Sequence, residues 1–229
     1  MPTQKKKTLP ALSPCECDSS CPDLPKHVSS AEALKLLKEG NKRYLKRTEQ
    51  HRCHEKRRQT YHYGQNPWAI VLTCADSRVS PELVFDVGIG ELFVVRVAGN
   101  IANACTIASI EYAVANLGIE LIVVLGHENC GAVKAALEGK AATYNLNQLL
   151  GHLTPVADEF GEKWRNAKSK SKKLELEYKA SEDNARNVAK QLKHQSREIL
   201  LPNKKLDIVP AVYQTGSGKV DWERKSAWA

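Results

Sequence analysis

The sequence lacks any apolar run that could cross a membrane. A membrane-spanning helix needs roughly 18 or more consecutive apolar residues, and no stretch of this 229-residue chain approaches that length. The N-terminal segment begins with a positively charged run but has no apolar core of the kind that a secretory signal contains. We therefore expect no association with a membrane and a cytoplasmic location, or a periplasmic or organellar one if a signal was removed.

The sequence also lacks the patterns of the common nucleic-acid-binding modules. The net charge is +8, and basic residues cluster in the ranges 42–58 and 163–173. Neither cluster is accompanied by an RNP aromatic pattern, a zinc-finger spacing or a basic zipper. We interpret both clusters as solvated surface and expect no nucleic-acid partner; a negatively charged substrate or partner is the alternative.

A complete disulfide framework is missing as well, because the chain contains seven cysteines, which is an odd number. Three of them, Cys15, Cys17 and Cys21, lie in a segment rich in Pro, Ser and Lys. We interpret residues 1–27 as a mobile tail, whose thiols are plain, redox-sensitive or part of a second metal site. Cys105 begins an apolar helical stretch, and we expect it in the core.

What the sequence does contain is an alternation of apolar strands with helices. The predicted strands are short apolar runs at residues 68–73, 91–97 and 121–125. The predicted helices between and after them cover residues 81–85, 106–117 and 131–139. Such alternation is typical of a parallel sheet that is covered by helices. We therefore predict a single α/β domain over residues 28–229, with a central, mostly parallel β-sheet flanked by helices.

Helical segments precede and follow this alternation. Ser29 and Glu32 form a capping-box pattern at the start of an amphipathic helix over residues 30–47, which predicts an N-terminal helical arm. Helical spacing recurs over residues 143–165 and 172–200, which predicts a C-terminal helical subregion.

A last strand is predicted near the end of the chain. Residues 206–213 form an apolar run, and residues 219–222 would pair with it across a turn that contains glycine. Pro210 cannot donate a hydrogen bond to a neighbouring strand, which indicates that this strand lies at the edge of the sheet.

Residues that can bind a metal follow two of the predicted strands directly. Cys74 comes just after the first buried strand. His127 and Cys130 come just after the third, with a spacing that lets both side chains reach one ion. Because open α/β sheets bind ligands at the carboxyl ends of their strands, we expect these side chains to lie side by side. Two thiolates and one imidazole favour zinc over magnesium or calcium.

The alternative is that Cys74 and Cys130 are small buried hydrophobic residues, as free cysteines often are. The His-x-x-Cys spacing alone does not decide between a metal site and a structural pair. The charged residues Asp76 and Arg78 lie close behind Cys74, and their presence at a second strand end favours the metal site.

These motifs resemble those of the β-class carbonic anhydrases. The resemblance rests on Cys-Ala-Asp-Ser-Arg-Val at residues 74–79 and on Gly-His-x-x-Cys-Gly at residues 126–131. It extends over about residues 30–222, through matching stretches at 39–41, 64–65, 90–96, 98–100, 110–114 and 211–213. The resemblance implies a zinc-dependent lyase that hydrates carbon dioxide reversibly to bicarbonate and a proton, by means of a zinc-bound hydroxide.

The resemblance also implies roles for individual residues of this sequence. Cys74, His127 and Cys130 match the ligands of one Zn²⁺ per subunit. Asp76 and Arg78 match the catalytic pair, in which the aspartate either pairs with the arginine or turns to the metal as a fourth ligand. We expect the arginine to keep the aspartate ionised and off the metal.

A further implication of the resemblance is a substrate pocket that two subunits share. In plant-type members this pocket is lined by residues that match Gln65, Phe93 and Tyr112, in part from the neighbouring subunit. We therefore expect a homodimer or tetramer with carbon dioxide and bicarbonate as its small-molecule partners. Val71 stands where bicarbonate-regulated members carry tryptophan, which favours the plant-type, open-site branch. Hydrolysis of carbonyl sulfide or carbon disulfide, and a non-catalytic zinc-stabilised binding protein, are the competing functions.

Overall fold

The computed structural model describes residues 28–50, 54, 57, 58, 62, 64–196 and 205–223. The segment 1–27, which we predict to be a mobile tail and which contains Cys15, Cys17 and Cys21, lies outside the described residues. In the described part of the chain, none of the helices is long and apolar enough to cross a bilayer.

Within the described residues, five strands form one sheet in the order β2-β1-β3-β4-β5. Their bounds are β1 Ala69–Thr73, β2 Leu92–Arg96, β3 Leu121–His127, β4 Asp207–Tyr213 and β5 Val220–Trp222. The pairs β1–β2, β1–β3 and β3–β4 are parallel, and β4–β5 is antiparallel. The sheet is therefore mostly parallel, which confirms the predicted fold class.

Helices precede, separate and follow the strands. They are α1 Ser30–Lys46, α3 Pro81–Val84, α4 Ala104–Leu117, α5 Gly131–Glu138, α6 Tyr144–Gly151, α7 Thr154–Asn166 and α8 Lys170–Gln195, with a short 3-10 turn, η1, at Ala98–Asn100. The helix α1 is the predicted N-terminal arm, and the side chain of Ser29 caps it by accepting from the backbone N–H of Glu32 at 3.4 Å. The helices α6 to α8 form the predicted C-terminal subregion.

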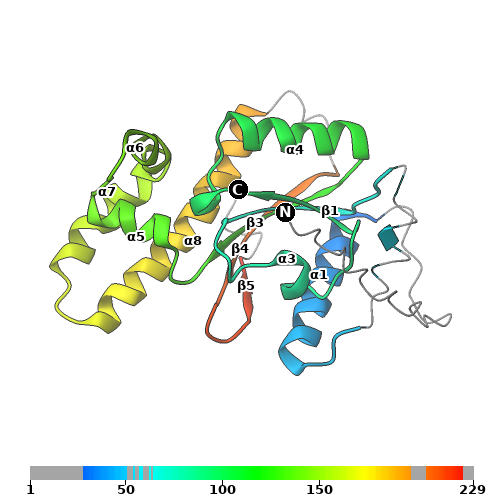
Figure 1. The fold of residues 1–229 in the computed structure, drawn as a ribbon, viewed down its shortest axis with the longest axis horizontal. Helices are drawn as coiled ribbons and strands as arrows, with labels where there is room; N and C mark the ends of the chain where they lie inside the picture. Colours follow the sequence, from blue (N-terminus) through cyan, green and yellow to red (C-terminus); the bar gives the residue numbers. More distant parts are fainter. Residues whose placement is uncertain are drawn as a thin grey trace, which may run out of the picture.

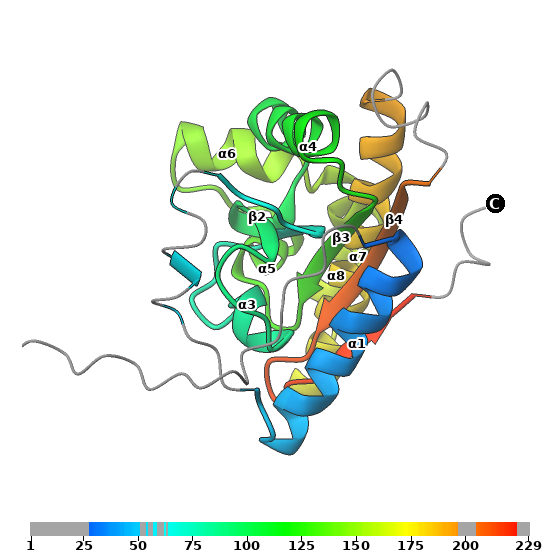
Figure 2. The same cartoon turned by 90° about the vertical axis from the view of Figure 1, so that its right-hand side faces the viewer.

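Each face of the sheet is covered by different helices, because alternate residues of a strand point to opposite sides. Val71 and Val123 pack with Leu37 of α1 on one face. Ile70 and Ile122 pack with residues of α4 and α8 on the other face. Figure 1 shows α1 and α4 on opposite sides of the strands, and Figure 2 shows the same arrangement from the side. The inner strands β1 and β3 are buried along their whole length, as a doubly covered parallel sheet requires.

A third apolar cluster lies beyond the carboxyl ends of β1 and β3. It combines Cys74 and Cys130 with buried residues of α5, α7 and α8. The C-terminal helices thus enclose the end of the sheet at which open α/β folds bind their ligands.

The structure corrects the predicted position of β4, which is not an edge strand because β5 lies outside it. The strand β5 pairs only with Ala211–Tyr213, so the missing N–H of Pro210 is not needed for that pairing. The carbonyl of Pro210 accepts a hydrogen bond from the N–H of Glu223 at 3.2 Å. A very short outer strand therefore tolerates a proline in the strand that it covers.

Two predictions about helices also change. The helical pattern over residues 143–165 forms two helices, α6 and α7, because Pro155 lies in the first turn of α7 and cannot continue a preceding helix. Cys105 was expected in the core, but it is exposed. The buried face of α4 is formed instead by Thr106, Ile110, Ala113 and Val114.

Candidate metal centre

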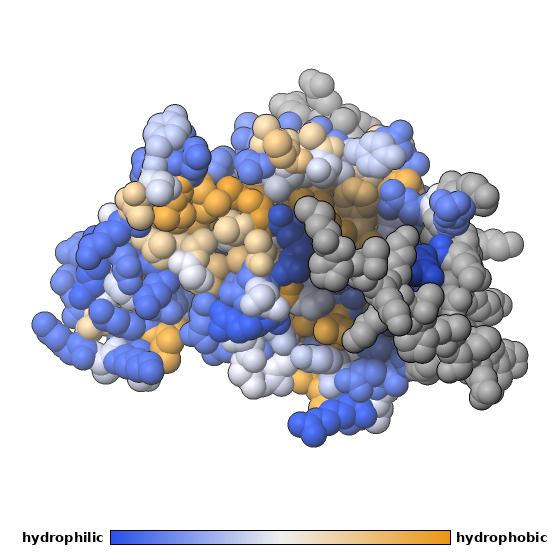
Figure 3. Space-filling view, viewed as in Figure 1, coloured by the Kyte–Doolittle hydropathy of each residue, from blue (hydrophilic) through white to orange (hydrophobic). Residues whose placement is uncertain are grey.

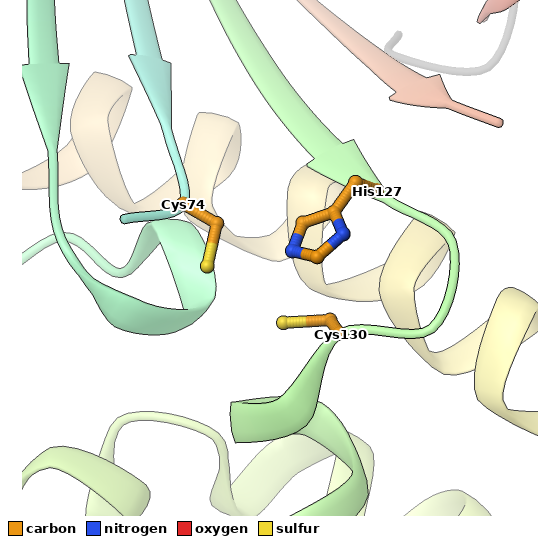
Figure 4. Close-up of side chains that lie close together, drawn as sticks. All are labelled: Cys74, His127 and Cys130. Atoms are coloured by element: carbon orange, nitrogen blue, oxygen red, sulfur yellow. The ribbon is translucent and has the colours of Figure 1, made fainter. Parts of the chain in front are cut away.

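Three side chains that can bind a metal converge at the carboxyl ends of β1 and β3. These strands are parallel neighbours, with Thr73 paired to Leu125, so the residues that follow them lie side by side. Cys74 follows β1, His127 ends β3, and Cys130 directly precedes α5. Their sulfur and nitrogen ligand atoms all lie within 4.8 Å of one another, and all three residues are buried. Figure 4 shows the two thiols and the imidazole facing a common space.

The imidazole of His127 is oriented by its own loop. Its Nδ1 donates a hydrogen bond to the backbone oxygen of Glu128 at 2.9 Å, which leaves the lone pair on Nε2. Within the part of the chain that is described, Nε2 has no hydrogen-bond partner although the residue is fully buried. A buried polar atom without a partner is destabilising. The tautomer fixed by Nδ1 is the one that a metal-binding histidine usually adopts.

The sulfur atoms of Cys74 and Cys130 lie within 4.8 Å of each other, and each affects the acidity of the other. The thiol of Cys130, which donates to Cys74, lowers the pKa of Cys74 to about 4. The same contact, together with burial, raises the pKa of Cys130 well above its usual value. Both cysteines are free rather than joined in a disulfide. A divalent cation bound between the two sulfur atoms would balance the charge of two thiolates.

The donor set fits zinc. Two thiolates with one imidazole form a known ligand set of catalytic zinc, and the softness of sulfur disfavours magnesium and calcium. The partnerless Nε2 of His127 and the closely spaced thiols of Cys74 and Cys130 are the structural observations that support a cation at this place.

Asp76 and Arg78 form a two-pronged ion pair beside the three ligands. Nε of Arg78 donates to Oδ1 of Asp76 at 2.9 Å, and Nη2 donates to Oδ2 at 2.8 Å. The backbone N–H of Arg78 adds a third bond to Oδ1 at 3.0 Å. These contacts hold the pKa of Asp76 well below its usual range. Oδ2 also lies 4.0 Å from Nε2 of His127, so the ionised carboxylate adjoins the ligand atoms.

Residues to which the sequence gave no role hold the segment around Cys74. Arg96, the last residue of β2, donates from Nε to the carbonyl of Cys74 at 3.2 Å and from Nη2 to the carbonyl of Asp76 at 2.7 Å. The backbone N–H of Gly99 donates to Sγ of Cys74 at 3.3 Å. Both residues lie in stretches that resemble the family. That resemblance was the one feature of the sequence that could have indicated a role for them.

The three predicted pocket residues lie on other parts of the chain. Gln65 is exposed ahead of β1, and Tyr112 is exposed on α4. Phe93 is half-buried in β2 and pairs with Ile70. Because a strand rises about 3.3 Å per residue, Phe93 lies about 13 Å along the sheet from the level of Cys74. Their role as a pocket shared between subunits stays a prediction.

The family model for carbonic anhydrase matches residues 69–220. This range covers most of the described sheet and contains Cys74, Asp76, Arg78, His127 and Cys130.

Curated relatives from bacteria carry the same name. Carbonic anhydrase 2 of Mycobacterium tuberculosis is 50% identical over 112 residues, which cover 48% of this chain and 54% of the relative. A carbonic anhydrase of Mycolicibacterium smegmatis is 43% identical over 128 residues, which cover 54% of this chain and 62% of the relative. This chain therefore spans only about half to three fifths of the length of these two relatives. A carbonic anhydrase of Synechococcus elongatus is 34% identical over 205 residues, which cover 82% of this chain and 70% of the relative.

Solved structures have the same fold. The β-carbonic anhydrase CafA of Aspergillus fumigatus has a TM-score of 0.66 at 25% identity, and the match covers 86% of this chain and 93% of that chain. A β-carbonic anhydrase of Sordaria macrospora, described as tetrameric, has a TM-score of 0.63 at 25% identity, with 73% of this chain and 89% of that chain covered. Fold, site and sequence agree, and the chain belongs to the β-class carbonic anhydrase family.

Proposed function

We propose that this protein catalyses the reversible hydration of carbon dioxide to bicarbonate and a proton. The observation that carries the proposal is the grouping of Cys74, His127 and Cys130 within 4.8 Å, beside the ion pair of Asp76 and Arg78. Relatives that are named carbonic anhydrases support it. No member of the ligand set or of the pair is missing, which disfavours a non-catalytic protein that is only stabilised by zinc.

Cys74, His127 and Cys130 would hold one zinc ion per subunit. Three protein ligands are the usual number at a catalytic zinc, because a further position is left for water or substrate. When bound, zinc supplies a Lewis acid that lowers the pKa of a coordinated water from about 15.7 toward about 7.

The carboxylate of Asp76 orients the attacking water. Because Arg78 holds the pKa of Asp76 well below its usual range, the carboxylate stays ionised and accepts a hydrogen bond without keeping the proton. The water oxygen forms the new bond to carbon, and the released proton leaves to solvent. Arg78 also keeps the carboxylate from turning away, through two parallel hydrogen bonds.

The site is closed toward the core and open toward the ion pair. The three ligands are buried, whereas the side chain of Arg78 is 51% exposed and that of Asp76 is 18% exposed. Carbon dioxide would therefore enter, and the proton and bicarbonate would leave, on the side of Arg78. The pairing of Asp76 with Arg78 and the valine at position 71 support the open-site arrangement.

A homo-oligomer is part of the proposal. The edge strand β2 has the sequence Leu-Phe-Val-Val-Arg, and none of its residues is fully buried. The helix α6 contains three leucines, yet it has no buried residue. Figure 3 shows a contiguous apolar area on the surface of the molecule near α5 and α6. A second copy of the chain would cover such a surface, and the Sordaria relative is described as tetrameric.

The proposal is tested by stopped-flow measurement of carbon dioxide hydration on purified protein whose zinc content is known. We expect hydration in proportion to bound zinc, because the metal is required for the chemistry. A carbonyl sulfide assay on the same samples separates the competing substrate. Zinc-loaded protein that hydrolyses only carbonyl sulfide, or that hydrates carbon dioxide no faster than buffer, would refute the proposal.

A further inference from the structure

One buried polar side chain near the metal centre has no role in the proposed catalysis. Asn184 of α8 is 2% exposed, and its Nδ2 donates to the carbonyl of Gly99 at 2.9 Å across a separation of 85 residues. Neither of the two motifs that carry the ligands contains Asn184. The contact therefore links the C-terminal helical subregion to the turn that touches Cys74.

Hydrogen bonds hold the turn around Gly99. Gly99 has a φ of 73° and a ψ of 14°, in the left-handed region that glycine enters without steric cost. The peptide between Gly99 and Asn100 is held at both ends, because its N–H donates to the carbonyl of Val97 at 3.0 Å and its carbonyl accepts from Asn184. The N–H of Gly99 then donates to Sγ of Cys74 at 3.3 Å. The contact with Asn184 therefore helps to set the direction of the N–H···S bond.

The same part of α8 also packs against the second ligand segment. A Cβ atom placed on Gly126 would lie 3.0 Å from the backbone oxygen of Ser181 and 3.6 Å from Cβ of Ala185. Gly126 directly precedes His127, so α8 lies in close contact with the end of β3. Residues 181, 184 and 185 share one helix face. This face of α8 supports both segments that carry ligands.

We propose that Asn184 is a positioning residue for the thiolate of Cys74. By fixing the turn at Gly99, Asn184 preserves the N–H···S bond. This bond sets the position of the sulfur and the strength with which it binds the metal. A hydrogen bond to a ligand sulfur withdraws charge from it, and outer contacts of this kind typically change metal affinity or activity roughly 10- to 100-fold. The inference rests on the proposed function only because it assumes that zinc binds Cys74, His127 and Cys130.

The first test measures the zinc affinity of the full chain by competition with a chelator. Asn184→Ala removes the donor, and Asn184→Asp keeps the size of the side chain while presenting an oxygen to the carbonyl of Gly99. Ser181→Ala is the matched control, because Ser181 is buried on the same helix face and its Oγ has no hydrogen-bond partner among the described residues. We expect both Asn184 variants to bind zinc roughly 10- to 100-fold more weakly than the wild type, and Ser181→Ala to stay within about threefold.

The second test separates positioning from a general loss of structure. Cobalt(II) bound in place of zinc gives a sulfur-to-cobalt charge-transfer band, whose energy reports on the hydrogen bond to the thiolate. We expect the band to move to lower energy in Asn184→Ala and Asn184→Asp, and thermal unfolding of the zinc-free proteins to show that the variants are folded. A loss of packing alone would not produce this shift.

The inference is overturned if folded Asn184 variants match Ser181→Ala in both zinc affinity and cobalt spectrum. A wild-type protein that binds zinc but does not hydrate carbon dioxide would refute the proposed function instead. In that case the comparison of affinities still decides the role of Asn184, so the two failures are distinguishable.

Discussion

Two of the candidate metal ligands, Cys74 and His127, are oriented by different kinds of contact. The segment of Cys74 depends on residues that are distant in the sequence. Arg96 on β2 binds two of its carbonyl groups, and the N–H of Gly99 binds its sulfur. Asn184 on α8 in turn holds the turn at Gly99.

The imidazole of His127 is oriented by its own segment, although that segment also has long-range contacts. The N–H of Glu128 donates to the carbonyl of Tyr213 at 2.9 Å, and Nη2 of Arg78 donates to the carbonyl of Asn129 at 3.2 Å. The imidazole binds the carbonyl of the adjacent Glu128, and Asn129 turns the chain with a φ of 56°. Cys130 then occupies the N-cap position of α5. The ring of His127 therefore takes its orientation from a neighbouring residue, whereas the sulfur and the carbonyl of Cys74 are held by residues further along the chain. Substitutions far from the sequence motifs should therefore affect Cys74 more than His127.

The largest effect should come from removing a ligand, and it should be equal for the two segments. We expect Cys74→Ser and Cys130→Ser each to lose stoichiometric zinc and, with it, the hydration of carbon dioxide, because a weak hydroxyl ligand replaces a thiolate. Metal analysis after dialysis measures this, with Cys105→Ser as the control because Cys105 is an exposed thiol. If either ligand variant kept one zinc per chain, the ligand assignment would be wrong.

A smaller effect should follow Asp76→Asn, which changes the charged pair but leaves the ligands. We expect zinc content to be unchanged and kcat/KM to fall by roughly 10²-fold or more, because the neutral amide no longer orients the attacking water as an ionised acceptor. Stopped-flow hydration at equal zinc content provides the measurement. Loss of zinc with full activity per bound metal would contradict this role.

Arg96→Ala tests the long-range support of Cys74, because it removes two hydrogen bonds from β2 to the segment of Cys74. We expect zinc affinity or turnover to fall by roughly 10- to 100-fold, as is typical when a supporting contact of a metal site is lost. Competition with a chelator and stopped-flow hydration both report the change. An unchanged affinity together with an unchanged turnover would show that β2 does not support Cys74.

The smallest effect should follow Glu128→Ala in the other ligand segment. This change removes the carboxylate oxygen that accepts from the N–H of Gly216 at 3.2 Å and from Oγ1 of Thr215 at 3.4 Å, but it leaves the backbone carbonyl that orients His127. We expect zinc affinity to change less than about threefold. If Glu128→Ala weakened zinc binding more than Arg96→Ala does, the contrast between the two segments would fail.

The sequence predicted the inner strands and the ligands because both leave local signals. The strands β1 and β3 are buried on both faces and therefore form unbroken apolar runs. Cys74 and His127 were placed side by side by the rule that parallel strands align their carboxyl ends. The contact between Asp76 and Arg78 spans two residues and was likewise visible as a motif.

What the sequence did not predict depends on pairing and packing over long distances. To predict that β4 lies inside the sheet, one must know that β5 pairs with it. The proline at position 210 does not provide this information. The exposure of Cys105 depends on which face of α4 meets the sheet. The contact of Asn184 with Gly99 joins residues that are 85 positions apart, and no spacing in the sequence indicates it.

X-ray absorption at the zinc edge of the purified wild-type protein tests the central claim most directly. If the two ligand segments bind one ion together, the spectrum will show two sulfur ligands at about 2.3 Å and nitrogen or oxygen ligands at about 2.0–2.2 Å. A zinc ion with one sulfur ligand or none, or protein without zinc, would contradict the account.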